Sequence, residues 1–439
     1  MSKNPKIVII GAGFGGIELV KNLHNKPVEV LLIDRNNYHN FQPLMYQVAT
    51  GGLEPASIAY PVRRIFRKYK NFKFRMAEVC EIYADRKQIL TSIGRIDYDY
   101  LIIASGSTNN FHNFESVKDK LLTLKSVPDA LTLRNSIFRN LERAMSENRK
   151  QSLEEIINIA IVGGGPAGLE LAGALAEMKK FVIPMEFPDL ELSRMNINLY
   201  QSGPELLNSM SKDASDKSLE YLIELGVNVF LNSRVKSYDG SMIELEDGAR
   251  FRTNTVIWTA GVKGATIDGF SENTIVSGNR IAVNEFNQVV GFQNVFAIGD
   301  VASHVTSQDP KGLPMLAPVA KHQGRLVAKN ILKSLNNKPM APFEYHHRGV
   351  MATIGRNKAV VDLPNFKFQG IFAWFVWMFI HIFSLVGFRN KLVTFIEWAA
   401  NYLNYDRALG LILNSAEVDE QKLEREREKL REQVVDYGK

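Results

Sequence analysis

Two glycine-rich turns with the same spacing constrain the fold of this chain more than any other feature. Residues 11–16 read GAGFGG and residues 163–168 read GGGPAG, so both match the pattern G-x-G-x-x-G. An apolar, β-branched run precedes each turn, at residues 6–10 and 156–162, and a helix-forming run follows it. This order of strand, turn and helix predicts an α/β protein with two Rossmann-type dinucleotide-binding domains.

The first turn has the residue types that a dinucleotide pyrophosphate requires. Gly11 permits the tight turn, Gly13 lets the backbone approach the phosphates, and Gly16 lets helix and strand pack closely. The helix expected at residues 17–25 directs free N–H groups at the phosphates. Asp34 ends the second predicted strand, where a carboxylate accepts hydrogen bonds from a ribose. The predicted site consists of Gly11, Ala12, Gly13, Phe14, Gly15, Gly16, Asp34 and Arg35.

The second turn repeats the pattern with Gly163, Gly165 and Gly168, but the acid is missing. The strand expected at residues 197–200 is followed by Gln201. A carboxylate at that place binds the ribose diol of NADH and repels the 2′-phosphate of NADPH. Gln201 keeps a hydrogen bond and removes the repulsion, so both nicotinamide dinucleotides remain open. Gln201 could equally replace Glu with little effect.

A third segment favours a flavin in the first site. Residues 294–302 read NVFAIGDVA, an apolar strand that ends in Gly299-Asp300. A carboxylate there can reach the ribityl and phosphate part of FAD. Two dinucleotide sites would then serve one reaction, because one holds the flavin and the other brings a nicotinamide whose hydride can reach the flavin.

Two further extended segments suggest where the chain passes between domains. Residues 101–104 and 255–259 each run into a pair of small residues, Ser105-Gly106 and Ala260-Gly261. We therefore expect an FAD-binding domain in two parts, with a nicotinamide domain inserted between them. The expected boundaries are 1–115 and 276–340 for the FAD-binding domain, 116–275 for the NAD(P)H-binding domain, 341–415 for a C-terminal membrane-associated helical region and 416–439 for a charged helical tail.

Composition excludes several kinds of chemistry. Cys80 is the single cysteine, so the chain has no internal disulfide, cysteine-based zinc site or iron–sulfur cluster, and we predict no metal site. This argues against a disulfide reductase and a sulfide:quinone oxidoreductase. The net charge of +6 allows phosphorylated cofactors or acidic lipids as partners. No RNA-binding pattern of basic and aromatic residues is present, so we expect no nucleic acid partner. Residues 1–6 show no targeting segment.

The C-terminal part of the chain is apolar and aromatic. Residues 370–387 read GIFAWFVWMFIHIFSLVG, interrupted only by His381 and Ser384. This segment is near the lower length limit for a membrane span, so a buried core helix, a span or an interfacial helix are all open. The Trp and Phe content, and the amphipathic pattern at residues 391–403, favour the interface.

Taken together, the segments resemble one family. Besides the glycine turns, the runs that narrow it are DRNNYHNFQPLMYQVATGGL, VIWTAGVKG, GVMATIGRNKAVVDL and GFRNKLVTFIEW. They are similar to the type II NADH dehydrogenases, the non-pumping NADH:quinone oxidoreductases. The resemblance covers nearly the whole chain apart from the charged tail. It implies an FAD site with Asp300 and backbone contacts at Val79 and Ala104, a nicotinamide turn at residues 163–168, and attachment to one membrane leaflet.

The resemblance also implies functional side chains, with two departures. Glu170 matches a family carboxylate at the junction of nicotinamide and flavin, which would help in quinone binding or proton delivery. The family commonly has a Gln in the place of Pro318, after Ala317, and a second Gln in the place of His322. Quinone contacts from those positions are thereby in doubt, although His322 or Gln323 could donate a proton. We predict Glu170, His322 and Gln323 as catalytic residues, and Ala317 and Pro318 as cofactor contacts.

The sequence thus predicts an FAD-dependent enzyme that takes hydride from NADH, or NADPH, and reduces a membrane quinone without pumping ions. It would lie on the cytoplasmic face of a bacterial inner membrane, and a homodimer is possible. The alternatives are a soluble flavin reductase, such as a ferredoxin:NADP reductase, and a membrane regulator that binds NAD(H) without turnover.

Overall fold

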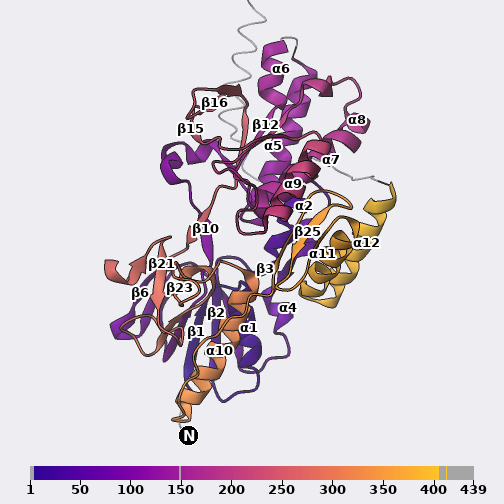
Figure 1. The fold of residues 1–439 in the computed structure, drawn as a ribbon. Helices are drawn as coiled ribbons and strands as arrows, with labels where there is room; N and C mark the ends of the chain where they lie inside the picture. The colour runs from indigo at the N-terminus through magenta and orange to yellow at the C-terminus, as the bar shows by residue number, and fades with distance from the viewer. Residues whose placement is uncertain (1–3, 148–149, 405–411, 413–439) are drawn as a thin grey trace, which may run out of the picture.

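The computed structural model describes residues 4–147, 150–404 and 412, and the tail expected at 416–439 lies outside them. Two parallel sheets form separate parts of the molecule, and two C-terminal helices lie beside them (Figure 1). Strand order in the first sheet is β22-β9-β1-β2-β5. Its strands are β1 (Lys6–Ile10), β2 (Glu29–Asp34), β5 (Phe72–Met76), β9 (Tyr100–Ile103) and β22 (Val295–Ala297).

The first sheet is covered by the helix that follows the first glycine turn. Helix α1 (Phe14–Asn22) packs along helix α10 (Ala317–Leu335), and their buried side chains share one core with the sheet. The helix begins three residues earlier than the sequence predicts. Gly15 and Gly16 are therefore already helical, which brings the first turn of α1 close to the phosphate-binding loop.

The second sheet has the same parallel character, with strand order β11-β18-β12-β13-β14. Its strands are β11 (Leu122–Thr123), β12 (Ile159–Val162), β13 (Ile197–Tyr200), β14 (Asn228–Phe230) and β18 (Thr255–Trp258). The helices beside it are α5 (Val127–Met145), α6 (Lys150–Ile157), α7 (Pro166–Phe181) and α9 (Lys212–Glu224). The fold class predicted from the two glycine turns is confirmed.

The strand predicted at residues 156–162 is wrong in its first part. Ile156 and Ile157 belong to the end of helix α6, and both are buried in the core. A short apolar run fits the buried face of a helix as well as a buried strand, so periodicity cannot separate the two. The strand itself begins at Ile159.

A narrow two-stranded connection lies between the two sheets. Strand β10 (Ser107–Asn109) pairs antiparallel with β19 (Val262–Gly264), and β10 lies between the two parts in Figure 1. Both strands directly follow the pairs of small residues at which the sequence predicts the crossings. The domain boundaries proposed above stay a prediction.

Smaller elements complete the described chain. The antiparallel sheets comprise β3 (Tyr38–Asn40) with β4 (Ala59–Pro61), β6 (Val79–Tyr83) with β7 (Gln88–Thr91) and β8 (Gly94–Asp97), and β15 (Val235–Tyr238) with β16 (Met242–Leu245) and β17 (Arg250–Arg252). Strands β20 (Ile275–Val276), β21 (Arg280–Val283) and β23 (Ala302–His304) form a mixed sheet, in which β21 pairs antiparallel with β20 and parallel with β23. Short helices are α2 (Met45–Ala49), α3 (Pro55–Ile58), α4 (Val62–Ile65) and α8 (Ile183–Glu186).

The C-terminal region is a three-stranded sheet followed by two helices. Strands β24 (Val350–Thr353), β25 (Ala359–Asp362) and β26 (Lys367–Gln369) pair antiparallel. Helix α11 (Ile371–Ser384) packs on this sheet, and α12 (Phe388–Asn404) packs on α3. In the described part of the chain, no helix has both the length and the hydropathy needed to cross a bilayer.

Helices α11 and α12 expose one continuous set of large apolar side chains, which we call the apolar face. Ala373 and Trp377 on α11 are buried against the protein, whereas the phenylalanines on the opposite side are at least half exposed. The members of the apolar face are Ile371, Phe372, Phe375, Phe379, Ile380, Phe383, Phe388, Leu392, Phe395 and Ile396. An exposed apolar surface of this extent marks an interaction site.

Candidate functional site

Each glycine turn has the geometry of a phosphate-binding loop. Gly11 has φ +105° and Gly163 has φ +116°, a region that side-chain-bearing residues rarely adopt. A Cβ added to Gly11 would lie 2.2 Å from the carbonyl oxygen of Ala104. A Cβ on Gly163 would lie 2.8 Å from the backbone of Ala260. Only glycine fits either place.

Each G-x-G-x-x-G pattern has two more glycines. One packs closely against the backbone of its own turn, and the other borders open space. A Cβ on Gly16 or on Gly168 would lie 2.0 Å from the carbonyl oxygen of the first glycine of its turn. A Cβ on Gly13 or Gly165 would meet nothing within 4 Å. The open space at those two positions, together with helix N-termini that no side chain caps, fits a bound pyrophosphate at both turns.

Asp34 and Gln201 occupy equivalent places at the two turns. The Ala12 N–H donates to Asp34 Oδ2 at 2.6 Å, and the Gly164 N–H donates to Gln201 Oε1 at 3.0 Å. Gln201 Nε2 also donates to the carbonyl oxygen of Glu205. The predicted ribose-binding position is thus filled by an acid at the first turn and by an amide at the second.

One cavity of about 1000 Å³ connects the first turn with the region of the second. Pro166 and Ala167, at the start of α7, line it beside Glu170. The predicted residues that line the cavity are Gly11, Ala12, Gly13, Phe14, Gly15, Asp34, Arg35, Val79, Ala104, Glu170, Asp300, Ala317 and Pro318. Those that do not line it are Gly16, Gly163, Gly165, Gly168, Gln201, His322 and Gln323.

Asp300 is tied to the other half of the molecule through a chain of hydrogen bonds. Ser107 Oγ donates to Asp300 Oδ2 and accepts a hydrogen bond from Lys125 Nζ at 2.7 Å. Burial lowers the pKa of Lys125. Lys125 follows β11 of the second sheet, so this chain joins elements of both sheets at the cavity. Sequence reasoning missed Ser107 and Lys125, because nothing local marks them.

Glu170 is a buried acid in the cavity wall. Burial raises its pKa to about 8, and the Thr353 backbone N–H and the Trp377 side chain only partly oppose this rise. The carboxyl group is therefore mostly protonated near pH 7. A neutral acid in this place can donate a hydrogen bond or a proton to a ligand in the cavity.

The structure separates the residues at the start of α10. Lys321 lines the cavity, whereas His322 packs edge-on against Tyr345 at 5.9 Å, outside it. Gln323 is buried, and its Oε1 accepts a hydrogen bond from the Gly299 N–H at 2.7 Å. Successive helical residues point about 100° apart, so Lys321 and His322 cannot face the same space. The catalytic roles predicted for His322 and Gln323 lack a direct contact with the cavity.

His381 also lines the cavity. Its Nδ1 donates to the Trp377 carbonyl oxygen at 2.7 Å, and its ring stacks on the Trp377 ring at 4.0 Å. Burial lowers its pKa to about 4, so the ring is neutral near pH 7. The one signal in the sequence was that His381 interrupts an otherwise apolar run.

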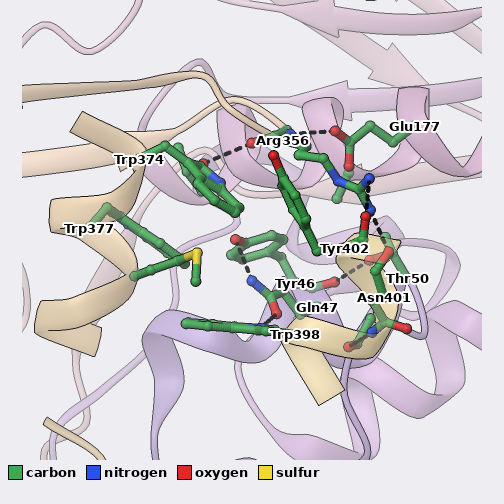
Figure 2. A pocket seen from close by; sticks show the side chains of 15 residues that line it. Tyr46, Gln47, Thr50, Glu177, Arg356, Trp374, Trp377, Trp398, Asn401 and Tyr402 are labelled. Carbon is green, nitrogen blue, oxygen red and sulfur yellow. Dashed lines mark hydrogen bonds between the residues drawn. The ribbon is translucent and has the colours of Figure 1, made fainter. Parts of the chain in front are cut away.

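A polar network fixes α12 around a second, smaller pocket, which shares Tyr46 with the cavity (Figure 2). Trp398 Nε1 donates to Gln47 Oε1 at 2.6 Å, and Gln47 Nε2 donates to the Tyr46 hydroxyl at 2.9 Å. Arg356 binds the carbonyl oxygens of Asn401 and Tyr402 at the end of α12. Tyr46 lines both the pocket in Figure 2 and the large cavity, so α12 is connected to the site through this residue.

Two parallel sheets, two phosphate-binding turns and a shared cavity define the class of flavin- and nicotinamide-dependent oxidoreductases with two dinucleotide sites. The family model for pyridine nucleotide-disulphide oxidoreductases matches residues 5–324, and the model for the NDH2 C-terminal domain matches residues 347–405. The chain belongs to the type II NADH:quinone oxidoreductase family.

Relatives and solved structures agree with this assignment. The type II NADH:quinone oxidoreductase Ndh of Mycobacterium tuberculosis is 30% identical over 417 residues, which cover 92% of this chain and 89% of that protein. The Haemophilus influenzae relative of the same description is 31% identical over 414 residues, 85% of this chain and 91% of that protein. The fold matches NDH2 from Plasmodium falciparum, solved with NADH, with a TM-score of 0.85 at 21% identity, covering 92% and 99% of the two chains.

Proposed function

We propose that this chain oxidises NADH and reduces a membrane quinone, with FAD bound along the first glycine turn. The observation that carries the proposal is the shape of the cavity. It begins at the first turn, passes the start of α7, and ends at α11, where Ile380 lines it and is also 40% exposed on the apolar face. One space therefore joins a dinucleotide site to a surface suited to lipid.

The residues around the first turn fit FAD. The open backbone at Gly13 and the free N–H groups of α1 would bind the pyrophosphate. Asp34 would accept hydrogen bonds from the ribose and Asp300 from the ribityl chain. Bound FAD supplies the redox chemistry, taking a hydride from NADH and passing two electrons to the quinone.

The second turn would hold the nicotinamide dinucleotide. Gly165 leaves room for its phosphates, and Pro166 and Ala167 line the cavity where the nicotinamide would enter. Gln201 provides an amide in place of the usual carboxylate, so NADPH can bind as well as NADH. Glu170 lies beside this entrance and keeps a proton at the cavity wall near pH 7.

The apolar face would attach the protein to one leaflet of a membrane. Arg389 and Lys391 stand at the start of α12, and the chain carries a net charge of +6, which favours an anionic lipid surface. We place the protein on the cytoplasmic face of a bacterial inner membrane. A homodimer stays a prediction.

Thiol chemistry is not needed for this reaction. Cys80, the one cysteine in the sequence, is exposed and does not line the cavity. The exposed apolar face also argues against a soluble flavin reductase, because such a protein has no use for a lipid-binding surface of this size.

The proposal is tested on protein purified in mild detergent under anaerobic conditions. We expect a yellow protein whose flavin absorbance is bleached by NADH and restored by a short-chain quinone. A regulator without turnover would bind NADH and leave the flavin oxidised. If the bleached flavin recovers with oxygen but not with the quinone, the acceptor is not a quinone and the proposal is wrong.

A further inference from the structure

Lys321 lines the cavity, and the proposed function gives its ammonium group no role. It lies on the first turns of α10, where the other cavity-lining residues are Ala317, Pro318 and Ala320. None of those three side chains has a hydrogen-bond donor. Any donor that α10 offers to a ligand from its side chains must therefore come from Lys321.

The Lys321 ammonium has no hydrogen bond or ion pair within the described residues. Its Nζ lies over the ring of Phe14, 5.0 Å from the ring centroid, in a cation–π contact. The carboxylate of Glu18 is held by Arg325 at 2.8 Å. Lys391 donates instead to the carbonyl oxygen of Phe383. Lys321 is only partly buried, and its ammonium faces the cavity without a partner from the described residues, so it is free to bind a ligand there.

Charged groups on four neighbouring elements act on Lys321. Burial lowers its pKa, and Lys21 on α1, Arg325 on α10 and Lys391 on α12 lower it further, whereas Glu18 on α1 raises it. His39 on β3 lies close by but is neutral, because burial lowers its pKa to about 4. Lys321 is therefore a better proton donor than an ordinary lysine.

His381 on α11 also lines the cavity, but it cannot take the same role. The Nδ1 proton of His381 is already donated to a backbone carbonyl oxygen, and the neutral ring carries no second proton. His381 can accept a hydrogen bond but not donate one. Ile380 and Ser384, one turn apart on α11, line the same end of the cavity next to the apolar face.

We propose that Lys321 is a catalytic residue for quinone reduction, which donates a hydrogen bond to a carbonyl oxygen of the quinone and then gives that oxygen a proton. This inference rests on the proposed function and names the residue that binds its acceptor.

The proton and electron count is complete without another reactant. NADH delivers two electrons and one proton as hydride, and the quinone takes up two electrons and two protons to become a quinol. The second proton comes from solvent. Lys321 passes its proton to the quinol oxygen and takes a new one from water, so the residue is unchanged after each turnover.

The test compares Lys321→Met with Lys329→Met, which removes the same charge from an exposed position of α10. Binding of a short-chain quinone to the oxidised protein is measured at equilibrium without NADH, and flavin bleaching by NADH is measured without quinone. Loss of one charge-assisted hydrogen bond should weaken quinone binding by Lys321→Met roughly 10-fold or more. The bleaching rate should stay as in the wild type, and Lys329→Met should behave as the wild type in both measurements.

Two further measurements separate the possible outcomes. Lys321→Arg should retain much of the quinone affinity, and the affinity of the wild type should fall as pH rises through the pKa of Lys321, while that of Lys321→Met should not. Lys321→Gln replaces Lys321→Met if the latter does not retain flavin. Equal quinone affinity of wild type, Lys321→Met and Lys329→Met would overturn the inference alone. A wild type that bleaches with NADH but neither binds nor reduces a quinone would overturn the proposed function as well.

Discussion

Two ionisable side chains of the cavity, Glu170 and Lys321, are shifted by burial toward their neutral forms. The pKa of Glu170 rises to about 8 and that of Lys321 falls. Both shifts bring the groups closer to the pH at which a quinone must be protonated. A residue that donates a proton works best when its pKa lies near the working pH, so burial gives both residues a suitable chemistry.

Replacement of Glu170 by Gln should change the pH dependence of stability. In the wild type the folded protein holds a proton that the unfolded chain releases above the ordinary pKa of 4.5. The part of the unfolding free energy that depends on the Glu170 proton is therefore fully present below about pH 4.5. It is lost as the pH rises to about 8, by at most about 1.4 kcal/mol per pH unit. The Tm of Glu170→Gln should fall less than that of the wild type between pH 6 and pH 9.

The control for this variant is Glu29→Gln at an exposed position. Its Tm should follow the wild type across the same pH range, as measured by calorimetry. The Glu170→Gln protein should also reduce quinone more slowly, while flavin bleaching by NADH continues. Parallel Tm curves for wild type and Glu170→Gln would show that Glu170 is not protonated in the folded protein at pH 7.

Gln201→Glu should change the choice of nucleotide. The glutamate keeps the acceptor for the Gly164 N–H, loses the donation to Glu205, and adds a negative charge near the 2′-position of the ribose. We expect the KM for NADPH to rise about 10-fold or more through repulsion and the KM for NADH to change little. Steady-state kinetics with both nucleotides measures this. An unchanged ratio of the two KM values would mean that Gln201 does not face the ribose.

At the scale of elements, α12 is anchored by side-chain hydrogen bonds on one side and exposed on the other. Asn390 Nδ2 donates to the carbonyl oxygens of Ala56 and Ser57 at 3.0 Å each, and Ser57 Oγ donates to Glu397. The same helix presents Phe395 and Ile396 to the outside. The polar contacts therefore fix the orientation in which the helix shows its apolar residues.

Removal of the Asn390 amide should loosen α12 specifically. Asn390 is 2% exposed, so Asn390→Ala leaves carbonyl oxygens without their buried donor, at a cost of about 1–3 kcal/mol. Hydrogen exchange should become faster in residues 388–404 and stay unchanged in β12. The neighbouring variant Arg389→Ala changes an exposed side chain and should leave both regions as in the wild type. Equal protection of α12 in both variants would contradict the anchoring role.

At the scale of the whole molecule, two dinucleotide sites, one cavity and one apolar face form a continuous path. The second sheet brings Pro166 and Glu170 to the cavity, and the first sheet brings Gly11 and Asp300. Ile380, His381 and Ser384 of α11 line its far end, and α11 and α12 turn apolar residues outward. Electrons supplied from the nucleotide side would therefore leave at the end of the cavity that lies next to the apolar face.

Polar substitutions on the apolar face should separate membrane binding from catalysis. Phe379→Ser with Phe383→Ser removes two side chains that are each 61% exposed. We expect binding to vesicles to fall about 10-fold or more in a flotation assay, with flavin bleaching by NADH unchanged. Ile93→Ser, at an apolar residue that is 55% exposed in the turn between β7 and β8, is the control. Wild-type vesicle binding by the double variant would rule out this face as the attachment site.

The sequence by itself determined the fold class and the backbone geometry of the two glycine turns. Gly11, Gly16 and Asp34 act within one βαβ unit, where spacing along the chain decides which groups meet, and the same holds for Gly163 and Gly168. Their positions in the structure agree with the motif. The aromatic run of α11 likewise predicted an exposed apolar helix, but it did not predict which residues of the helix would be buried.

Only the tertiary structure decided which ionisable groups face the cavity. Lys125, Lys321 and His381 come from segments far apart in the sequence. They line one cavity because of how the two sheets, α10 and α11 pack. The sequence favoured His322, one residue from Lys321, because motif positions do not show the direction of a side chain on a helix. A rotation of about 100° per residue separates a group in the cavity from one outside it, and long-range packing sets that rotation.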